Sequence, residues 1–144
     1  MARYKDELVT NVLKEHLHQG EELKNWAYGI KQPPIILLIV LVLIAIIPGV
    51  IAMILLTKEY IVGLTDKRII VLTVKGGKAD VKEVMEYDLA SIPMSFTSTG
   101  VIFTVIKVTD EAKPLEVKFH RAGMKENRMH SIAIAKAFNP NHKA

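Results

Sequence analysis

Residues 32–57 form an unbroken stretch of 26 residues without a charged side chain. Within this stretch, 35–57 contains 17 Ile, Leu or Val residues among 23. A helix that is apolar on every face belongs in a membrane or in the core of a large protein. Because a chain of 144 residues cannot bury such a helix, the stretch argues against an ordinary soluble monomer and predicts a membrane segment at 35–57.

The length of this segment fits a bilayer. Twenty-three helical residues extend about 34 Å, and a hydrocarbon core is about 30 Å thick. The 17 branched apolar residues favour insertion by on the order of 7 kcal/mol. A signal peptide has a shorter apolar core near the start and a cleavage site of small residues. This run begins at Ile35 and ends in Thr57-Lys58, so we expect it to be retained.

Pro48 and Gly49 interrupt the apolar run, and proline kinks or breaks a helix. Two arrangements follow: one kinked membrane span, or a re-entrant hairpin with arms at 35–47 and 50–57. The second arm is only about 12 Å long as a helix, which excludes two full crossings. Elementary physics favours the single span.

Basic residues near the apolar run give a weak indication of orientation. Lys24 and Lys31 precede the run, whereas Lys58, Lys67 and Arg68 follow it. Because basic residues favour the cytoplasmic side, we expect the C-terminal domain to lie in the cytoplasm. Three aromatic residues flank the run and are candidates for the membrane interface: Trp26, Tyr28 and Tyr60.

The N-terminal 20 residues predict an amphipathic helix at 2–19 that ends near Gly20. Apolar residues recur at intervals of three and four, namely Tyr4, Leu8, Val9, Val12, Leu13 and Leu17. Its charges balance, which is untypical of a membrane-surface helix, so we expect it to pack against a neighbour, for example another copy of the chain. The juxtamembrane segment at 21–34 fits a helical face and a strand alternation equally well.

Residues 58–144 predict a β-rich domain. The patterns indicate strands at 60–64, 68–74, 81–89, 92–96, 101–108 and 115–119, and a helix at 125–138. Turn signals lie at 65–67, 76–78 and 98–100. Strands at this spacing favour an antiparallel barrel or sandwich, with the terminal helix covering one end or edge.

The residues Tyr60-Ile61-Val62-Gly63-Leu64-Thr65-Asp66-Lys67-Arg68-Ile69-Ile70-Val71-Leu72 form a strand, a Leu-Thr turn, an arginine and a second strand. With the upstream Gly20-Glu21, they resemble bacterial pleckstrin-homology-like (PH-like), or GRAM-like, membrane proteins. The resemblance implies meandering strands followed by one C-terminal helix, and a role as an assembly platform. Such relatives often carry two spans, whereas this chain has room for one, so the resemblance brings the hairpin level with the single span.

No arrangement of residues points to catalysis. The chain lacks cysteine, a nucleophile elbow, a Walker loop, a Rossmann glycine pattern and a His-Glu-x-x-His motif. His16 and His18 fall on different helical faces, and no spaced carboxylate joins His120 and His130. We therefore expect no enzyme activity, cofactor or metal. The basic excess of +4 is too mild for a nucleic-acid partner.

Four basic residues near the C-terminus form the best candidate cluster for binding a lipid or a protein: Lys118, Arg121, Lys125 and Arg128. If this cluster faces a membrane, each residue gains about 1 kcal/mol from anionic lipid. The cluster supports an alternative function as a peripheral sensor of anionic lipid.

Taken together, the sequence predicts a membrane-anchored α+β protein. Its expected parts are an amphipathic helix at 1–20, a juxtamembrane segment at 21–34, one hydrophobic membrane segment at 35–57, and a PH-like antiparallel barrel or sandwich with a C-terminal helix at 58–144. The expected function is a non-enzymatic scaffold or interaction platform in the bacterial inner membrane. We expect membrane lipids, further copies of this chain and an unidentified protein as its partners.

Overall fold

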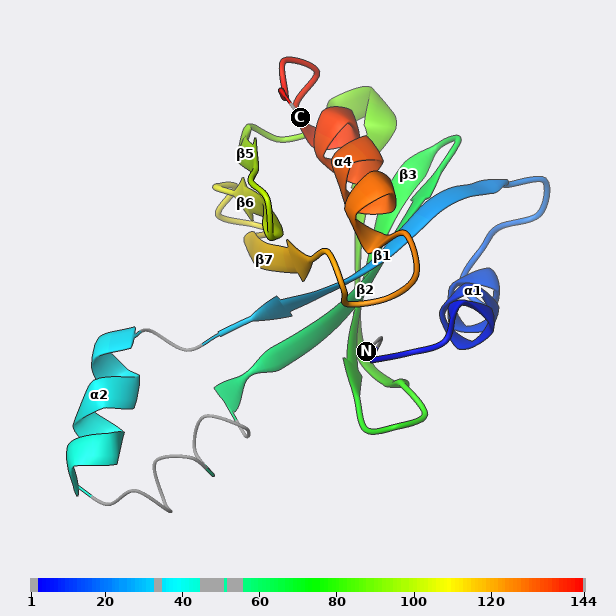
Figure 1. The fold of residues 1–144 in the computed structure, drawn as a ribbon. Coiled ribbons are helices and arrows are strands. Elements are labelled where there is room, and N and C mark those ends of the chain that lie inside the picture. The colour runs from blue at the N-terminus through cyan, green and yellow to red at the C-terminus, as the bar shows by residue number, and fades with distance from the viewer. Residues whose placement is uncertain (1–2, 33–34, 45–50, 52–55, 144) are drawn as a thin grey trace.

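The computed structural model describes residues 3–32, 35–44, 51 and 56–143. Seven antiparallel strands form one sheet in the order β4-β3-β2-β1-β7-β6-β5 (Figure 1). The strands are β1 (Leu23–Lys31), β2 (Lys58–Thr65), β3 (Arg68–Lys75), β4 (Asp80–Asp88), β5 (Ser95–Thr99), β6 (Phe103–Val108) and β7 (Leu115–His120). The helices within the described ranges are α1 (Asp6–Lys14), α2 (Ile35–Ile44), the short 3-10 helix η1 (Leu89–Ser91) and α4 (Asn127–Phe138).

The β2–β3 hairpin forms where the sequence predicts it. Both strands are rich in β-branched residues, which suit a pleated, buried surface. The Thr65 hydroxyl accepts hydrogen bonds from the backbone N–H groups of Lys67 and Arg68, at 3.1 and 3.0 Å. This local bonding closes the turn between the two strands. The predicted strand at 115–119 is also confirmed, since β7 alternates buried and less buried residues.

The sheet bends sharply between β1 and β7, whose pairing is limited to Ile30 and Lys118. As a result, the β5–β7 portion faces the β1–β4 portion, and α4 covers the space between them (Figure 1). The core between the two portions is built from buried residues of both, including Val62, Val71, Ile106 and Val117, together with Ile134 of α4.

The opposite face of β1–β4 is covered by α1 and the residues before it. Val9 and Leu13 of α1 pack there on Ile61 and Ile70. Burial on both faces explains why β2 and β3 are almost continuously apolar. The neighbour expected for the N-terminal helix is thus the sheet of its own chain. The helix is shorter than predicted, because it ends at Lys14.

The structure decides the ambiguous pattern at 21–34 in favour of a strand. β1 pairs along its length with β2, and Lys31 is the register partner of Lys58. Residues 23–31 therefore lie inside the sheet, although the predicted β-domain begins at residue 58. The pattern was ambiguous because Trp26, Tyr28 and Ile30 share one face of a strand, whereas Leu23, Trp26 and Ile30 share one face of a helix.

The expected fold class, a membrane-anchored protein with a hydrophobic span, is wrong. Across the described ranges, no helix has both the length and the apolar character that a membrane crossing requires. α2 has ten residues, or about 15 Å. The single kinked span also conflicts with the pairing of β1 and β2, because the chain on either side of the apolar stretch belongs to one sheet. The prediction that this is a transmembrane protein is therefore also wrong.

The antiparallel barrel or sandwich expected for residues 58–144 is a second correction, because the structure has one open sheet. β4 and β5 are the two edges of an open sheet. The strand predicted at 92–96 forms at 95–99 instead, after η1, and the turn predicted at 98–100 lies further along. β6 begins at Phe103 rather than at residue 101 and is buried on one face only. The outer face of β6, which carries Phe103, is therefore exposed.

Candidate functional site

The apolar stretch leaves the sheet and returns to it at a single place. It follows β1 and precedes β2, and the strand ends Lys31 and Lys58 are directly opposite each other. α2 begins at Ile35, four residues after Lys31, and stands away from the sheet (Figure 1). The described residues of this stretch, 35–44, 51 and 56, are called the apolar excursion below.

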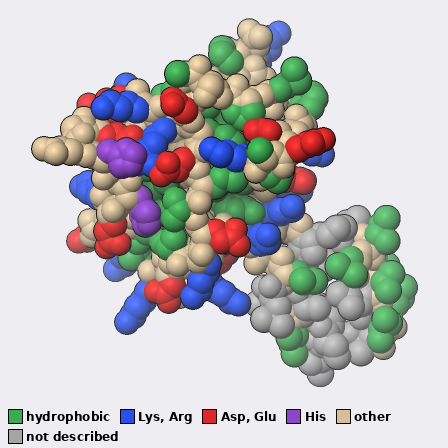
Figure 2. Space-filling model, turned by 180° about the vertical axis from the view of Figure 1, so that it is seen from behind, with side chains coloured by type: hydrophobic (Ala, Val, Ile, Leu, Met, Phe, Trp, Pro, Cys, Tyr) green, Lys and Arg blue, Asp and Glu red, His purple; other side chains and the backbone are tan. Residues whose placement is uncertain are grey.

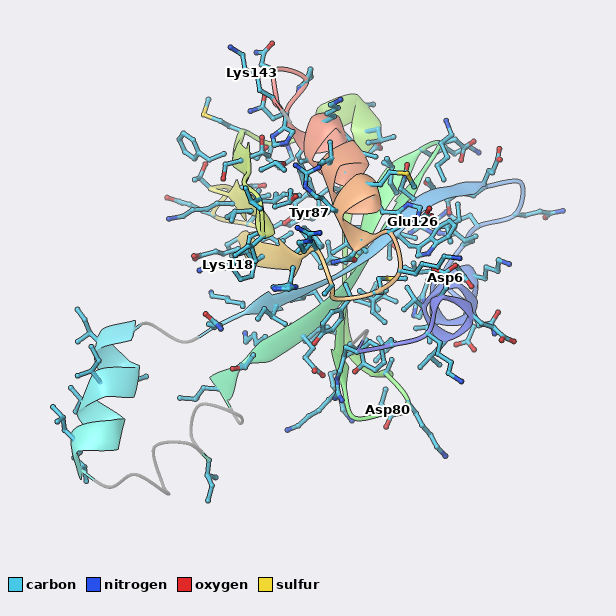
Figure 3. All side chains as sticks on the ribbon, in the orientation of Figure 1. Asp6, Asp80, Tyr87, Lys118, Glu126 and Lys143 are labelled. Carbon is cyan, nitrogen blue, oxygen red and sulfur yellow. The ribbon has the colours of Figure 1, made fainter. Side chains whose placement is uncertain are left out.

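The side chains of the apolar excursion are exposed. In Figure 3 the sticks on α2 extend outward without meeting the sheet. Exposed fractions lie between 41% and 80% for eight residues: Ile36, Leu37, Ile39, Val40, Leu43, Ile44, Ile51 and Leu56. Contiguous apolar surface of this kind marks a contact with a membrane or another protein.

Basic side chains gather where the apolar excursion meets the sheet. An open pocket of about 590 Å³ is lined by Arg3, Lys58, Lys75 and Lys82, with Glu59 as its acidic residue. We call it the basal pocket. Figure 2 shows Lys and Arg side chains, in blue, at the junction between the body of the molecule and the lobe that carries the apolar residues.

Hydrogen bonds within the protein engage the carboxylate of Glu59. It accepts from Arg3 Nε at 3.0 Å, from the Tyr28 hydroxyl at 2.9 Å and from the Tyr4 hydroxyl at 3.2 Å. Burial is the main cause that raises the pKa of both tyrosines, and the nearby Glu59 carboxylate raises it further. The single hydroxyl proton of Tyr4 is shared between Glu59 and the backbone carbonyl of Gly76, which lies at 2.8 Å. These bonds hold the N-terminal segment, and Arg3 with it, beside the β3–β4 turn.

A second open pocket lies on the other side of Lys58, and we call it the flanking pocket. Its volume is about 510 Å³, and its charged lining residues are Lys31, Lys58, Lys107, Lys113, Glu83 and Glu116. Burial raises the pKa of Tyr60 in this pocket, and the charges of Glu83 and Glu116 raise it further. The flanking pocket therefore has a weaker excess of positive charge than the basal pocket.

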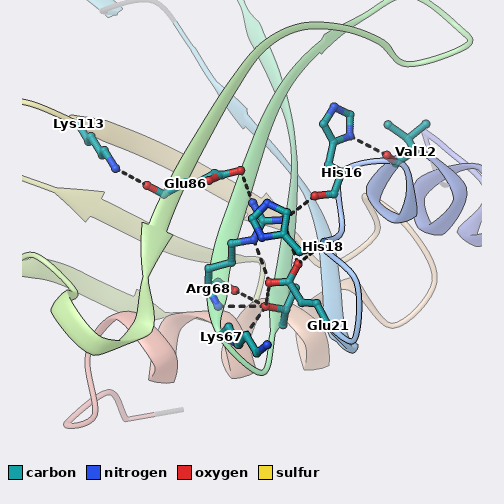
Figure 4. Close-up of polar contacts among 9 residues, drawn as sticks. Val12, His16, His18, Glu21, Lys67, Arg68, Glu86 and Lys113 are labelled. Carbon is teal, nitrogen blue, oxygen red and sulfur yellow. Dashed lines mark hydrogen bonds and ion pairs between the residues drawn. The ribbon is translucent and has the colours of Figure 1, made fainter.

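A third polar group surrounds Arg68 at the start of β3 (Figure 4). Its guanidinium donates two hydrogen bonds of 2.9 Å to the carboxylate of Glu21, and it also contacts Glu86 and the backbone carbonyl of His16. Hydrogen bonding to Arg68 lowers the pKa of Glu21 from 4.5 to about 2. Each of the three guanidinium nitrogens is hydrogen-bonded within the protein, so Arg68 joins the N-terminal linker to the β2–β3 hairpin.

The aromatic residues predicted at a membrane interface lie in the protein interior or near it. Tyr28 and Tyr60 are buried, with 8% and 7% of their surface exposed. Trp26 is partly buried, stacks on His130 with 4.5 Å between ring centroids, and donates a hydrogen bond from its indole N–H to Asp6. These contacts account for the three aromatic residues without a membrane.

The basic residues predicted as a C-terminal cluster lie on β7, on the following loop and on the first turn of α4. Lys118 is partly buried over the ring of Phe103, at 5.9 Å from its centroid. Arg121, Lys125 and Arg128 are exposed. Their role in binding a lipid or a protein stays a prediction. The predicted kink or turn at Pro48 and Gly49 falls outside the described residues.

Sequence reasoning missed the basal pocket because its basic residues come from three strands and the segment before α1. Arg3 precedes α1, whereas Lys58, Lys75 and Lys82 belong to β2, β3 and β4. The available signal was the register of the β2–β3 and β3–β4 pairs, which places the start of β2 beside the end of β3 and the start of β4. Within the described ranges, no group of three potential ligands suits a metal ion.

The chain was compared with protein-family models, with curated proteins and with solved structures, and none of them matches it. The resemblance to bacterial PH-like proteins therefore stays a prediction. The apolar excursion and the charges at its base are the features of this chain that bear on its function.

Proposed function

We propose that this protein is a non-enzymatic module that binds to the surface of a membrane by inserting its apolar excursion into one leaflet. The observation that carries the proposal is the pairing of Lys31 with Lys58 at the base of the exposed excursion. Because the chain leaves and re-enters the sheet at one place, the sheet stays on one side of the bilayer.

The dimensions of the described helix support a contact with one leaflet. α2 contains ten residues, which extend about 15 Å, or half of a hydrocarbon core of about 30 Å. A helix also satisfies its interior backbone groups within itself, as lipid requires. Moving a half-exposed Ile, Leu or Val into lipid gains on the order of 1 kcal/mol. The eight exposed side chains together supply enough free energy for stable binding.

The charges near the excursion support the cytoplasmic face of a bacterial inner membrane as its location. With both flanks on one side, Lys31 and Lys58 lie together at the base of the excursion. Basic residues close to an inserted segment favour the cytoplasmic side. The basic residues before and after the excursion therefore favour the same orientation, whereas a single span would place them on opposite sides of the membrane.

Binding to lipid vesicles tests this proposal. We expect the full chain, diluted from detergent, to float with phosphatidylcholine vesicles. Leu43→Glu places a charge on the most exposed described position of the excursion, and it should reduce vesicle binding about tenfold or more. The matched control is Met129→Glu, which changes an exposed residue of α4 and should bind like the unmodified chain.

Two results would contradict the proposal. The first is a full chain that stays unbound at every vesicle concentration. The second is a Leu43→Glu variant that binds as well as Met129→Glu, since binding would then not depend on the excursion.

The free edge at β5 favours a second function, in which the bound module assembles with further copies of itself. Residues 92–106 contain no charged side chain, and Met94, Phe96 and Val101 are more than 60% exposed. Natural edge strands usually carry charges that prevent pairing. The β4 edge follows this rule, with Lys82, Glu83, Glu86 and Asp88. An uncharged edge favours antiparallel pairing with the same strand of a second copy.

Native mass measured in detergent tests self-association. We expect a dimer or a larger oligomer for the unmodified chain and a monomer for Phe96→Lys, because the new charge lies on the β5 edge. Val84→Lys makes the same change at an exposed position of the β4 edge and should leave the mass unchanged. A monomeric unmodified chain would remove this second function and leave membrane binding unaffected.

A further inference from the structure

The basal pocket combines an excess of positive charge with direct access to the apolar excursion. Its lining includes four basic residues, Arg3, Lys58, Lys75 and Lys82, and one carboxylate, Glu59. Gln32 and Thr57, the first and last residues of the uncharged stretch at 32–57, also line it. The pocket thus lies at the level where inserted apolar side chains give way to water.

The internal bonds of Glu59 direct its carboxylate to Arg3 and two tyrosines rather than to the lysines of the pocket. Two tyrosine hydroxyls and Arg3 already satisfy its oxygens. The three lysines are exposed, and among the described residues that line this pocket no hydrogen bond or ion pair joins them to an acidic side chain. An anionic ligand therefore meets lysine donors that are accessible from water.

We propose that the basal pocket binds the phosphate group of an anionic phospholipid while the apolar excursion occupies the same leaflet. This inference rests on the proposed membrane binding and adds the class of lipid to it. A phosphate diester beside the pocket accepts hydrogen bonds from Lys58, Lys75 and Lys82. The acyl chains of the same lipid then lie along the exposed side chains of α2.

The flanking pocket is a weaker candidate for the same ligand. It contains two carboxylates, Glu83 and Glu116, beside its lysines. One of those lysines, Lys113, already donates to the backbone carbonyl of Glu86 at 2.7 Å. Repulsion from the carboxylates and the engagement of Lys113 both disfavour a phosphate there.

Vesicle binding with and without phosphatidylglycerol tests the inference. We expect the unmodified chain to bind phosphatidylglycerol-containing vesicles more tightly than phosphatidylcholine vesicles. Lys75→Gln/Lys82→Gln should lower binding to the anionic vesicles about tenfold and leave binding to phosphatidylcholine unchanged. Both positions are exposed, so the fold should persist, which a circular dichroism spectrum checks.

The matched control removes the same charge elsewhere. Lys24→Gln/Lys136→Gln changes two exposed lysines outside both pockets, and it should lower binding about threefold or less. Equal losses in the two double variants would overturn the inference, because net charge alone would then explain the attraction. Binding to phosphatidylcholine would still support the proposed function in that case, whereas its absence would refute the proposed function.

A soluble phosphate compound is the other source of the same chemistry. The chemical shift of the Gly76 amide, at the edge of the pocket, reports occupancy for the full chain in detergent micelles. We expect phosphatidylglycerol added to the micelles to shift this signal at lower concentration than inorganic phosphate or glycerol 3-phosphate. A shift with inorganic phosphate and none with phosphatidylglycerol would overturn the lipid as the ligand.

Discussion

At the scale of single residues, the ion pair between Glu21 and Arg68 is almost fully withdrawn from water. Their side chains are 0% and 7% exposed, and the two hydrogen bonds between them form a bidentate pair. Both residues belong to the sequence segments that carry the PH-like resemblance. The structure supplies a physical reason for their joint presence, because the glutamate preceding β1 is the partner of the arginine that begins β3.

Replacing Glu21 with Gln tests the stability that this pair provides. The pKa of Glu21 is lowered from 4.5 to about 2, which corresponds to on the order of 3 kcal/mol. A lowered pKa gives stability that is fully present above about pH 4.5 and is lost as the pH falls towards 2. We therefore expect Glu21→Gln to reduce the free energy of unfolding by on the order of 3 kcal/mol at pH 7.

Urea unfolding followed by the fluorescence of Trp26 measures this effect. The difference between Glu21→Gln and the unmodified chain should shrink as the pH is lowered from 4.5 to 2. Glu22→Gln is the matched control, because the Glu22 side chain is exposed. A difference that is the same at pH 7 and pH 3 would show that the charge of Glu21 does not stabilise the fold.

At the scale of secondary-structure elements, β1 is the strand that joins the two portions of the sheet. Its contact with β7 is close, because a Cβ added to Gly29 would lie 2.3 Å from Val117 and 2.9 Å from Phe119. Asn127 of α4 supports the same strand by bonding both the backbone N–H and the carbonyl of Tyr28, at 2.8 and 2.9 Å.

Adding one methyl group at this junction should therefore separate the strands. We expect Gly29→Ala to reduce the free energy of unfolding by about 1–3 kcal/mol, because the two neighbouring side chains must move. Gly77→Ala is the control, since nothing lies within 4 Å of a Cβ at that position. Thermal unfolding compares the two variants, and equal midpoints would show that β1 and β7 separate without cost.

The stretch that contains the apolar excursion is an insertion between two paired strands, so it can be replaced by a short turn. Replacing residues 33–56 with Asn-Gly leaves Gln32 and Thr57 as the flanks of a two-residue hairpin turn. We expect this variant to keep the circular dichroism spectrum of the full chain, to stay in solution without detergent and to lose vesicle binding. Loss of the folded spectrum would contradict the independence of the sheet from the excursion.

At the scale of the whole molecule, the sheet excludes a topology that the hydropathy pattern permits. A single crossing separates residues 3–31 from residues 58–143 by a bilayer, whereas β1 pairs with β2 along its length. α1 also packs on strands from both sides of the excursion. The proposed membrane contact is therefore one-sided.

Labelling in sealed vesicles tests this topology. The chain has no cysteine, so Lys24→Cys and Lys78→Cys each introduce one exposed thiol, before and after the excursion. A maleimide that does not cross membranes should label the two variants to the same extent. Labelling of only one variant until detergent is added would establish opposite sides and refute the one-sided arrangement.

Local patterns predicted much of the C-terminal half. The alternation in β7, the β-branched runs of β2 and β3 and the turn between them each depend on neighbouring residues, and each is confirmed. The position of β1 was not predictable in this way. Its alternation is no stronger than its helical pattern, and its partner follows an insertion of 26 uncharged residues, so long-range pairing decides its structure.

The candidate site was predictable only in part. The apolar excursion is evident from the distribution of charge, whereas the basal pocket depends on four residues that lie far apart in the sequence. The aromatic residues Tyr28 and Tyr60 flank the apolar run, yet both are buried in the sheet. Proximity to an apolar run in the sequence does not reveal which way a strand turns a side chain.

The sequence by itself determined that residues 32–57 lack every charge and require an apolar partner, because composition sets the free energy of hydration regardless of fold. Only the tertiary structure decided that this segment leaves the sheet and returns to it at the same place. The physical reason is the pairing of β1 with β2, since backbone hydrogen bonds between distant segments fix the ends of the insertion together.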